Sequence, residues 1–143
     1  MPNPTAAMIV IGDEILSGRT RDSNMHHLAG QLTSVGIDLK EVRVVGDENG
    51  TIIAAVQELS RVYDSVFTSG GIGPTHDDIT ADCIAAAFNK NIDVREDARA
   101  ILAEHYAKSA TELNTARLRM ARIPDDATLI DNPVSAAPGV KLE

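Results

Sequence analysis

Aromatic and cysteine residues are scarce in this chain: phenylalanine and tyrosine occur twice each, tryptophan is missing, and Cys83 is the single cysteine. One cysteine excludes an intramolecular disulfide. Because a lone thiol fits a reducing compartment and no charged-then-apolar leader opens the chain, we expect a cytoplasmic protein. The longest uninterrupted apolar run, residues 6–11, is far shorter than the ~20 residues that a membrane-spanning helix needs. We therefore expect no membrane partner.

Basic residues are also few. The 13 lysines and arginines are outnumbered by 21 acidic residues, which gives a formal net charge of −8. Such a balance disfavours broad contact with nucleic acid or an anionic membrane, but still permits local phosphate binding through backbone N–H groups or a metal. A chain of 143 residues buries about 68–70% of its unfolded surface. We therefore expect residues 1–143 to form a single domain without structural metal.

Short apolar runs alternate with segments of helical periodicity. The expected strands are 6–11, 38–45, 65–68, 92–94 and 127–130. The expected helices are 24–35, with Ser23 as N-cap and Gly36 at its end, 51–62, 79–89, 96–107 and 113–122. We expect loops at 12–18 and 132–139. This rhythm predicts an α/β fold, a three-layer αβα sandwich around a mostly parallel sheet.

A glycine-rich loop follows the expected strand 65–68. Three glycines fall within positions 70–73, ahead of an expected helix. Glycine lets a backbone approach a ligand closely, and consecutive N–H groups near a helix N-terminus favour a phosphate. A tight strand-to-helix turn would explain the same composition. The expected ligand-binding residues of this loop are Ser69, Gly70, Gly71, Ile72, Gly73, Pro74 and Thr75.

Aspartates gather after this loop, at Asp77, Asp78 and Asp82. The helix dipole favours acidic residues at a helix start, so capping alone would explain one or two of them. Asp47 follows the second expected strand and would reach the same sheet edge if the strands are parallel. Asp47 and Asp78 are therefore candidate ligands of a hydrated Mg²⁺, although Asp47 alone is as readily a turn residue.

Other reactive side chains form no recognisable site. His26 and His27 are adjacent, so on a helix they point about 100° apart and cannot form a metal pair. His76 lies within the glycine loop without an evident partner. Cys83 falls on the apolar stripe of its helix, which favours a small core residue. The dinucleotide-binding and P-loop fingerprints do not occur, so neither class of enzyme is supported.

The segment 69–80, SGGIGPTHDDIT, resembles the signature of the molybdopterin-binding (MoaB/Mog-like) domain. The likeness is closest to the branch found in competence/damage-inducible protein CinA and in the N-terminal part of FAD synthases. Residues 12–18 with 22–24, 46–47, 117–121 and 132–139 look like other motifs of that branch. The resemblance therefore spans nearly the whole chain.

This resemblance implies an α/β domain that binds a phosphate-containing pterin or nucleotide. In the Mog-type branch, two aspartates serve metal-assisted adenylyl transfer to molybdopterin, and their positions match Asp47 and Asp78, which become the candidate catalytic residues. In the CinA-like branch, the same pocket is associated with hydrolysis of the pyrophosphate in ADP-ribose or FAD. Both imply a divalent metal, Mg²⁺, Mn²⁺ or Co²⁺. The further ligand-binding residues that the motifs imply are Gly12, Asp13, Glu14, Ser17, Gly18, Asn24, Pro138 and Gly139.

Three functions follow as hypotheses. The first is a CinA-like domain that hydrolyses a nucleotide pyrophosphate, the second is molybdenum cofactor biosynthesis by adenylyl transfer, and the third is a ligand-binding module without catalysis. Because members of this family commonly associate through the domain, the resemblance implies a homo-oligomer with a small-molecule ligand. The family pattern continues past residue 143, so we expect the domain to be incomplete at its C-terminal end.

Overall fold

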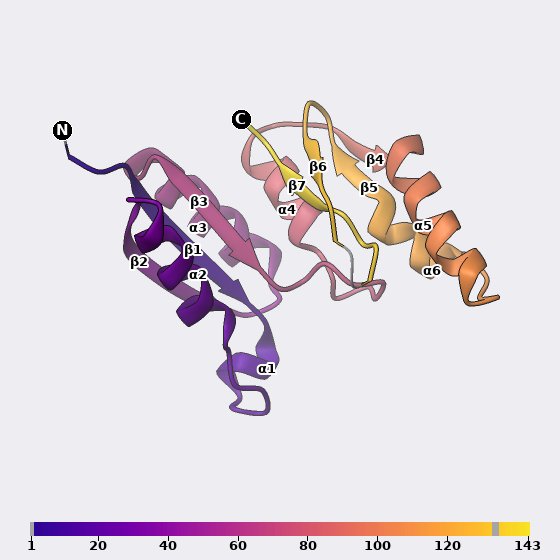
Figure 1. The fold of residues 1–143 in the computed structure, drawn as a ribbon, viewed down its shortest axis with the longest axis horizontal. Coiled ribbons are helices and arrows are strands. Elements are labelled where there is room, and N and C mark those ends of the chain that lie inside the picture. Colours follow the sequence, from indigo (N-terminus) through magenta and orange to yellow (C-terminus); the bar gives the residue numbers. More distant parts are fainter. Residues whose placement is uncertain (1, 133–134) are drawn as a thin grey trace. The chain divides into compact units, whose positions relative to one another are not determined.

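The computed structural model describes residues 2–132 and 135–143. In it the chain forms two compact units, Met1–Gly70 and Gly71–Glu143, which are drawn in Figure 1. The first unit contains β1 (Thr5–Ile11), α1 (Asp13–Leu16), α2 (Asn24–Ser34), β2 (Asp38–Val45), α3 (Asn49–Val62) and β3 (Ser65–Ser69).

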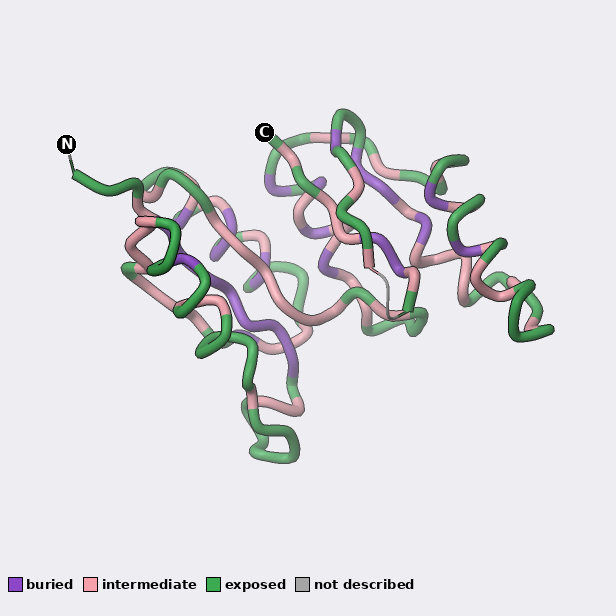
Figure 2. The backbone as a smooth tube through the Cα atoms, in the orientation of Figure 1, coloured by how far each residue is buried: buried purple, intermediate pink, exposed green. Residues whose placement is uncertain are grey.

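A parallel sheet of order β2-β1-β3 forms the centre of the first unit. The central strand carries the apolar run of residues 6–11, and none of these six residues is more than 3% exposed (Figure 2). Helices α2 and α3 cover opposite faces of this sheet (Figure 1), which explains why β1 is apolar on both sides. The expected α/β fold with a parallel central sheet is confirmed.

The order of the strands also determines where a ligand fits. Strand β1 lies in the middle of the sheet, with β2 on one side and β3 on the other. The connection that leaves β1 leads to β2, and the connection that leaves β2 leads to β3 on the opposite side. The chain connections therefore diverge at the carboxyl ends of β1 and β3. In register, Ile11 lies opposite Val45 and Val10 lies opposite Ser69, which brings the ends of all three strands to one edge. Crevices at such points are the usual ligand sites of open α/β sheets.

The second unit contains α4 (Thr80–Ala87), β4 (Ile92–Val94), α5 (Glu96–Lys108), α6 (Thr115–Leu118), the 3₁₀ turn η1 (Arg119–Ala121), β5 (Arg122–Pro124), β6 (Thr128–Ile130) and β7 (Gly139–Lys141). Strand β4 pairs with β5, and β6 with β7, both antiparallel. A small core holds the unit together, made of Ala98, Leu102, Ala121, Ile123 and Ala127.

Three local predictions were wrong. Residues 12–18, expected as a loop, contain the one-turn helix α1. The helix expected over 113–122 ends at Leu118, because Arg122–Pro124 pair with β4 instead and a strand cannot keep helical hydrogen bonds. Gly139, placed in an irregular segment, begins β7.

Helix α2 begins after Ser23 as predicted, but the Ser23 side chain makes no capping hydrogen bond. The Asp22 carboxylate accepts hydrogen bonds from the backbone N–H of Asn24 and of Met25 instead. Gly36, at the other end, has a φ of 79°, the left-handed conformation with which a glycine ends a helix.

Cys83 lies in α4 and is 1% exposed. Burial, together with nearby Asp82, raises the pKa of its thiol to about 11. A thiol that stays protonated at neutral pH is a poor nucleophile, so the prediction of a small core residue is confirmed. None of the helices within the described part of the chain has the length and apolar character to cross a membrane.

Candidate functional site

A pocket opens in the first unit where β1 and β3 end, with a volume of about 230 Å³. We call it the switch-point pocket. It is lined by Val10, Ile11, Glu14, Ile15, Thr20, Arg21, Asp22, Ser23, Asn24, Ser69 and Gly70. Four of the residues expected to bind ligand, Glu14, Asn24, Ser69 and Gly70, therefore meet at one place although they come from three segments of the chain.

Gly70 is required by the geometry of this pocket. Its φ is +98°, and a Cβ atom there would lie 2.0 Å from the carbonyl oxygen of Ile11. Nearby, the Asn24 side-chain amide donates a 2.7 Å hydrogen bond to the Ser69 hydroxyl. The start of α2 and the end of β3 are therefore joined directly across the wall of the pocket.

The loops after β1 and β2 are joined by two aspartates. The backbone N–H of Asp13 donates to Asp47 Oδ2 at 3.1 Å, and the N–H of Asp47 donates to Asp13 Oδ1 at 3.0 Å. Gly46 leaves room for this exchange, because its Cβ would lie 2.6 Å from Asp13 Oδ1. Asp47 is therefore more than a turn residue: its carboxylate helps to hold two ligand-side loops together.

The donor chemistry of this aspartate pair fits a divalent metal. Each carboxylate uses one oxygen in the exchange, so a second oxygen of Asp13 and of Asp47 is left to face a cation. Mg²⁺ takes one or two carboxylates and completes its shell with water and phosphate oxygens. No group of three or more His, Cys, Asp or Glu side chains within residues 2–132 and 135–143 is arranged to hold a metal ion.

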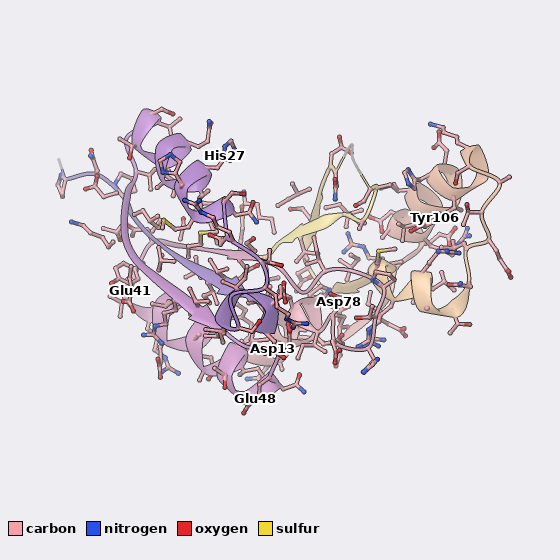
Figure 3. The ribbon with its side chains drawn as sticks, turned by 90° about the horizontal axis from the view of Figure 1, so that it is seen from below. Asp13, His27, Glu41, Glu48, Asp78 and Tyr106 are labelled. Atoms are coloured by element: carbon pink, nitrogen blue, oxygen red, sulfur yellow. The ribbon has the colours of Figure 1, made fainter. Side chains whose placement is uncertain are left out.

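Asp78, the other predicted metal ligand, lies in the second unit and is shown in Figure 3. Helix α4 begins two residues later, at Thr80, so Asp78 does not lie in the first turn of that helix. Its carboxylate accepts hydrogen bonds from the Thr75 N–H at 2.9 Å and the Thr75 hydroxyl at 2.8 Å, and from the Gly73 backbone. A Cβ at Gly73 would lie 2.8 Å from Asp78 Oδ2.

These contacts change the acidity of Asp78. Partial burial raises the pKa of its carboxyl, but the hydrogen bonds from Thr75 and Gly73 and the charge of Arg119 together hold that pKa below its usual value of 3.8. The carboxylate therefore stays ionised and organises the loop around itself. The N–H groups of Gly73 and Thr75, expected to face a phosphate, face Asp78 here.

The other predicted residues are spread over both units. Gly12 and Asp13 begin the loop after β1, and Ser17 and Gly18 follow α1. Pro74 and Thr75 line a separate pocket of the second unit, Gly71 has a φ of 67°, and Ile72 is 48% exposed. Pro138 is buried beside Gly139 of β7. Their roles in binding ligand, and the pairing of Asp47 with Asp78, stay predictions.

Two cationic residues were missed as site residues. Arg21 lines the switch-point pocket, and Arg119 lines the pocket of the second unit. Arg21 lies between the motif segments 12–18 and 22–24, and nothing in the sequence indicated that it lines a pocket. Arg117, Arg119 and Arg122 did give a signal, because they are three closely spaced basic residues within the segment 113–122 that was expected to be helical. The Arg122 guanidinium binds Asp82 at 2.7 Å, which leaves the other two for the pocket.

Comparison with known proteins places this geometry in a family. Residues 7–143 match the family described as "Probable molybdopterin binding domain". A CinA-like protein of Geobacter metallireducens is 38% identical over 136 residues, which are 95% of this chain and 33% of that protein. A probable FAD synthase of Caenorhabditis briggsae is 50% identical over 95 residues, 66% of this chain and 18% of that protein.

The fold is shared as well. The crystal structure of the protein CinA from Thermoplasma acidophilum superposes with a TM-score of 0.88 and 35% identity, and covers 98% of this chain and 82% of that one. The chain spans about half or less of the length of curated relatives that it matches, 54%, 33% and 18% in three cases. By its sequence match over 137 of 143 positions (7–143) and its fold, this chain belongs to the molybdopterin-binding domain family, among the CinA-like proteins.

Proposed function

We propose that this domain binds a phosphate-containing nucleotide or pterin in the switch-point pocket and hydrolyses the pyrophosphate of an ADP-ribose-type or FAD-type nucleotide with a divalent metal. The observation that carries the proposal is the meeting of Glu14, Asn24, Ser69 and Gly70 in one pocket. The pocket opens at the strand ends where α/β sheets bind ligands. Glu14, Asn24, Ser69 and Gly70 lie in the segments 12–18, 22–24 and 69–80, whose motifs resemble those of the CinA-like branch.

The charged side chains that line the switch-point pocket support the proposal that a metal ion binds there together with the nucleotide. Glu14 and Asp22 bring two carboxylates to its lining, against one guanidinium from Arg21. A pyrophosphate placed beside them is repelled unless a cation lies between the like charges. Asp13 and Asp47, in the adjoining loops, are the residues that would hold such a cation, and the metal would neutralise charge on the phosphoryl oxygens.

The reaction balances without a further reactant. The oxygen of a water molecule attacks one phosphorus of the P–O–P link, and the bond from that same phosphorus to the bridging oxygen breaks. The bridging oxygen leaves with the other phosphate, and the two protons of water end on the product phosphates or in solvent. ADP-ribose would give AMP and ribose 5-phosphate, and FAD would give AMP and FMN. Asn24 and Ser69, joined by their hydrogen bond, offer a polar wall that can orient the ligand.

The test is an incubation of the protein with ADP-ribose, with FAD, and with ATP plus molybdopterin, each with Mg²⁺, Mn²⁺ or Co²⁺, and separation of the products by chromatography. We expect AMP from ADP-ribose or FAD only when metal is present. Adenylylated molybdopterin would instead make the protein a cofactor-biosynthesis enzyme. Binding without any product, over all metals, would contradict hydrolysis and favour a non-catalytic module.

A further inference from the structure

The start of α3 carries a dipeptide that the proposed reaction does not use. Asn49 and Gly50 are the first two residues of this helix, and both are exposed. Of the seven asparagines in the sequence, only Asn49 is followed by glycine. The side-chain carbonyl carbon of an asparagine and the backbone nitrogen of the next residue can close a five-membered ring, because the chain holds the two atoms close together. Glycine has no Cβ atom to obstruct their approach.

The nitrogen that would react is not occupied by the helix. The first N–H groups of an α-helix have no carbonyl oxygen within the helix to bond. At this end of α3, the N–H of Ile52 donates to the carbonyl oxygen of Glu48 at 3.1 Å. The N–H of Gly50, two positions earlier, has no acceptor among residues 2–132 and 135–143. Attack of this nitrogen on Asn49 therefore breaks no backbone hydrogen bond of Gly50.

The first turn of α3 is also held weakly. Glu48 is the N-cap residue but its side chain makes no capping hydrogen bond, although a capping side chain normally satisfies one of the first N–H groups. A Cβ atom at Gly50 would meet nothing within 4 Å, so no packed neighbour restrains the backbone there. Fraying ends of this kind open at almost no cost in free energy, and opening gives the backbone the freedom that ring closure needs.

We propose that Asn49 is a site of spontaneous deamidation. The Gly50 nitrogen attacks the side-chain carbonyl carbon of Asn49, the bond from that carbon to Nδ2 breaks, and ammonia leaves with the proton of the Gly50 N–H. Water then opens the resulting succinimide ring at either of its two carbonyl carbons, which gives aspartate or isoaspartate. Water is the only co-reactant. The inference goes beyond the proposed function, because the modification requires neither a nucleotide nor a metal.

Both products change the start of α3. Each replaces a neutral amide with a negative charge, in a segment that already holds Asp47 and Glu48. The helix dipole favours an acidic side chain in the first turn, so the aspartate product stabilises α3. Isoaspartate instead inserts an additional carbon into the backbone before Gly50, which the regular spacing of a helix does not accommodate. The modification therefore marks aged molecules beside the loop that carries Asp47.

The test is incubation of the whole protein in mildly alkaline buffer, followed by tryptic digestion and mass spectrometry. Cleavage after Arg43 and Arg61 releases the segment 44–61, and deamidation increases its mass by about 1 Da. A synthetic peptide of the same segment gives the rate in an open chain. We expect the folded protein to deamidate within about tenfold of the peptide rate, because opening the first turn costs little. A rate more than about a hundredfold slower than that of the peptide would overturn the inference.

Gly50→Ala is the matched variant, because its Cβ atom obstructs ring closure yet has room in the fold. We expect it to deamidate about tenfold more slowly or less. Gly30→Ala, in equally open surroundings within α2, should leave the rate at Asn49 unchanged. Asn114, whose side chain caps α6, should keep its amide over the same period. Equal rates in Gly50→Ala and the unaltered protein would refute the attack by the Gly50 nitrogen.

The aspartate product can also be made directly, as Asn49→Asp. We expect its urea midpoint of unfolding to exceed that of Asn49→Gln, which keeps a neutral amide at the start of α3. The reverse order would contradict the stabilising effect of the aspartate product. None of these measurements depends on nucleotide cleavage, so a protein that cleaves no nucleotide would contradict the proposed hydrolysis and leave the deamidation of Asn49 unaffected.

Discussion

Asp13 and Asp47 exchange hydrogen bonds across 34 residues of sequence, each accepting from the backbone N–H of the other. The exchange joins the loops that leave β1 and β2, and it requires the small residue at Gly46. It also positions two carboxylates beside each other at the edge of the sheet where the switch-point pocket opens. A structural and a metal-binding role of these aspartates can be separated by substitution.

Asp47→Asn tests the metal role of that carboxylate. The asparagine side-chain oxygen can still accept from the N–H of Asp13, so we expect the urea midpoint of unfolding to change little. The charge that would hold a divalent metal is lost, and we expect metal-dependent AMP release to fall at least a hundredfold, a loss of about 2.7 kcal/mol of transition-state stabilisation. Glu48→Gln, next in sequence and exposed, is the matched control. Similar activity in both variants would show that Asp47 is only structural.

Gly70→Ala tests the close approach at the end of β3. A Cβ atom would lie 2.0 Å from the Ile11 carbonyl oxygen, at a φ of +98°. We expect the free energy of unfolding to fall by about 1–3 kcal/mol, or by more if β1 must shift.

The matched control for this change is Gly30→Ala. Gly30 lies within α2 and a Cβ there meets nothing within 4 Å, so the alanine should stabilise the protein by about 0.5–1 kcal/mol. Urea unfolding followed by circular dichroism measures both effects. If the two variants shift the midpoint in the same direction, steric exclusion at Gly70 is refuted.

Asp78→Asn tests whether that carboxylate organises the glycine loop. Because its pKa is lowered in the folded protein, the ionised form stabilises the fold above the ordinary pKa of 3.8, and this contribution disappears as the pH falls through the lowered folded-state value. We expect the variant to lose about 1–3 kcal/mol at neutral pH and to show a weaker loss of stability on acidification.

The place of Asp78 just before a helix would by itself predict only a small loss of stability when the carboxylate is removed. The loop hydrogen bonds change that expectation. Asp77→Asn, adjacent and exposed, is the control. Measurements of the urea midpoint from pH 3 to pH 7 compare the two, and identical curves for both variants would rule out the organising role.

Gly71→Val tests the loop itself. Gly71 has a φ of 67°, a conformation that a β-branched residue resists. We expect weaker ligand binding together with some loss of stability. Gly50→Val serves as the control, because Gly50 lies in α3 outside the expected site, and a Cβ atom there meets nothing within 4 Å. Unchanged nucleotide affinity in Gly71→Val, measured by calorimetry, would move the binding site away from this loop.

The local pattern of apolar residues predicted several of the strands correctly. The run at 6–11 predicted a strand buried on both faces, and β1 is that strand; the predicted strands 38–45 and 92–94 match β2 and β4 in full. The prediction was poorer where helical periodicity in the sequence competes with the pairing of a strand to a distant partner. The basic segment 113–122 has helical periodicity, yet its last residue pairs with Val94 in an antiparallel ladder. The energy of that pairing depends on a partner 28 residues away, which periodicity does not register.

By itself, the sequence determined the alternation of elements, the glycine-rich turn and the motifs that mark the family, because each depends on residues close together in the chain. Only the tertiary structure decided which groups meet. Asp13 faces Asp47, Gly70 lies against Ile11, and the N–H groups of Gly73 and Thr75 bond to Asp78. These contacts follow from strand order and loop closure, which bring distant residues to one edge and so lie beyond the reach of local spacing.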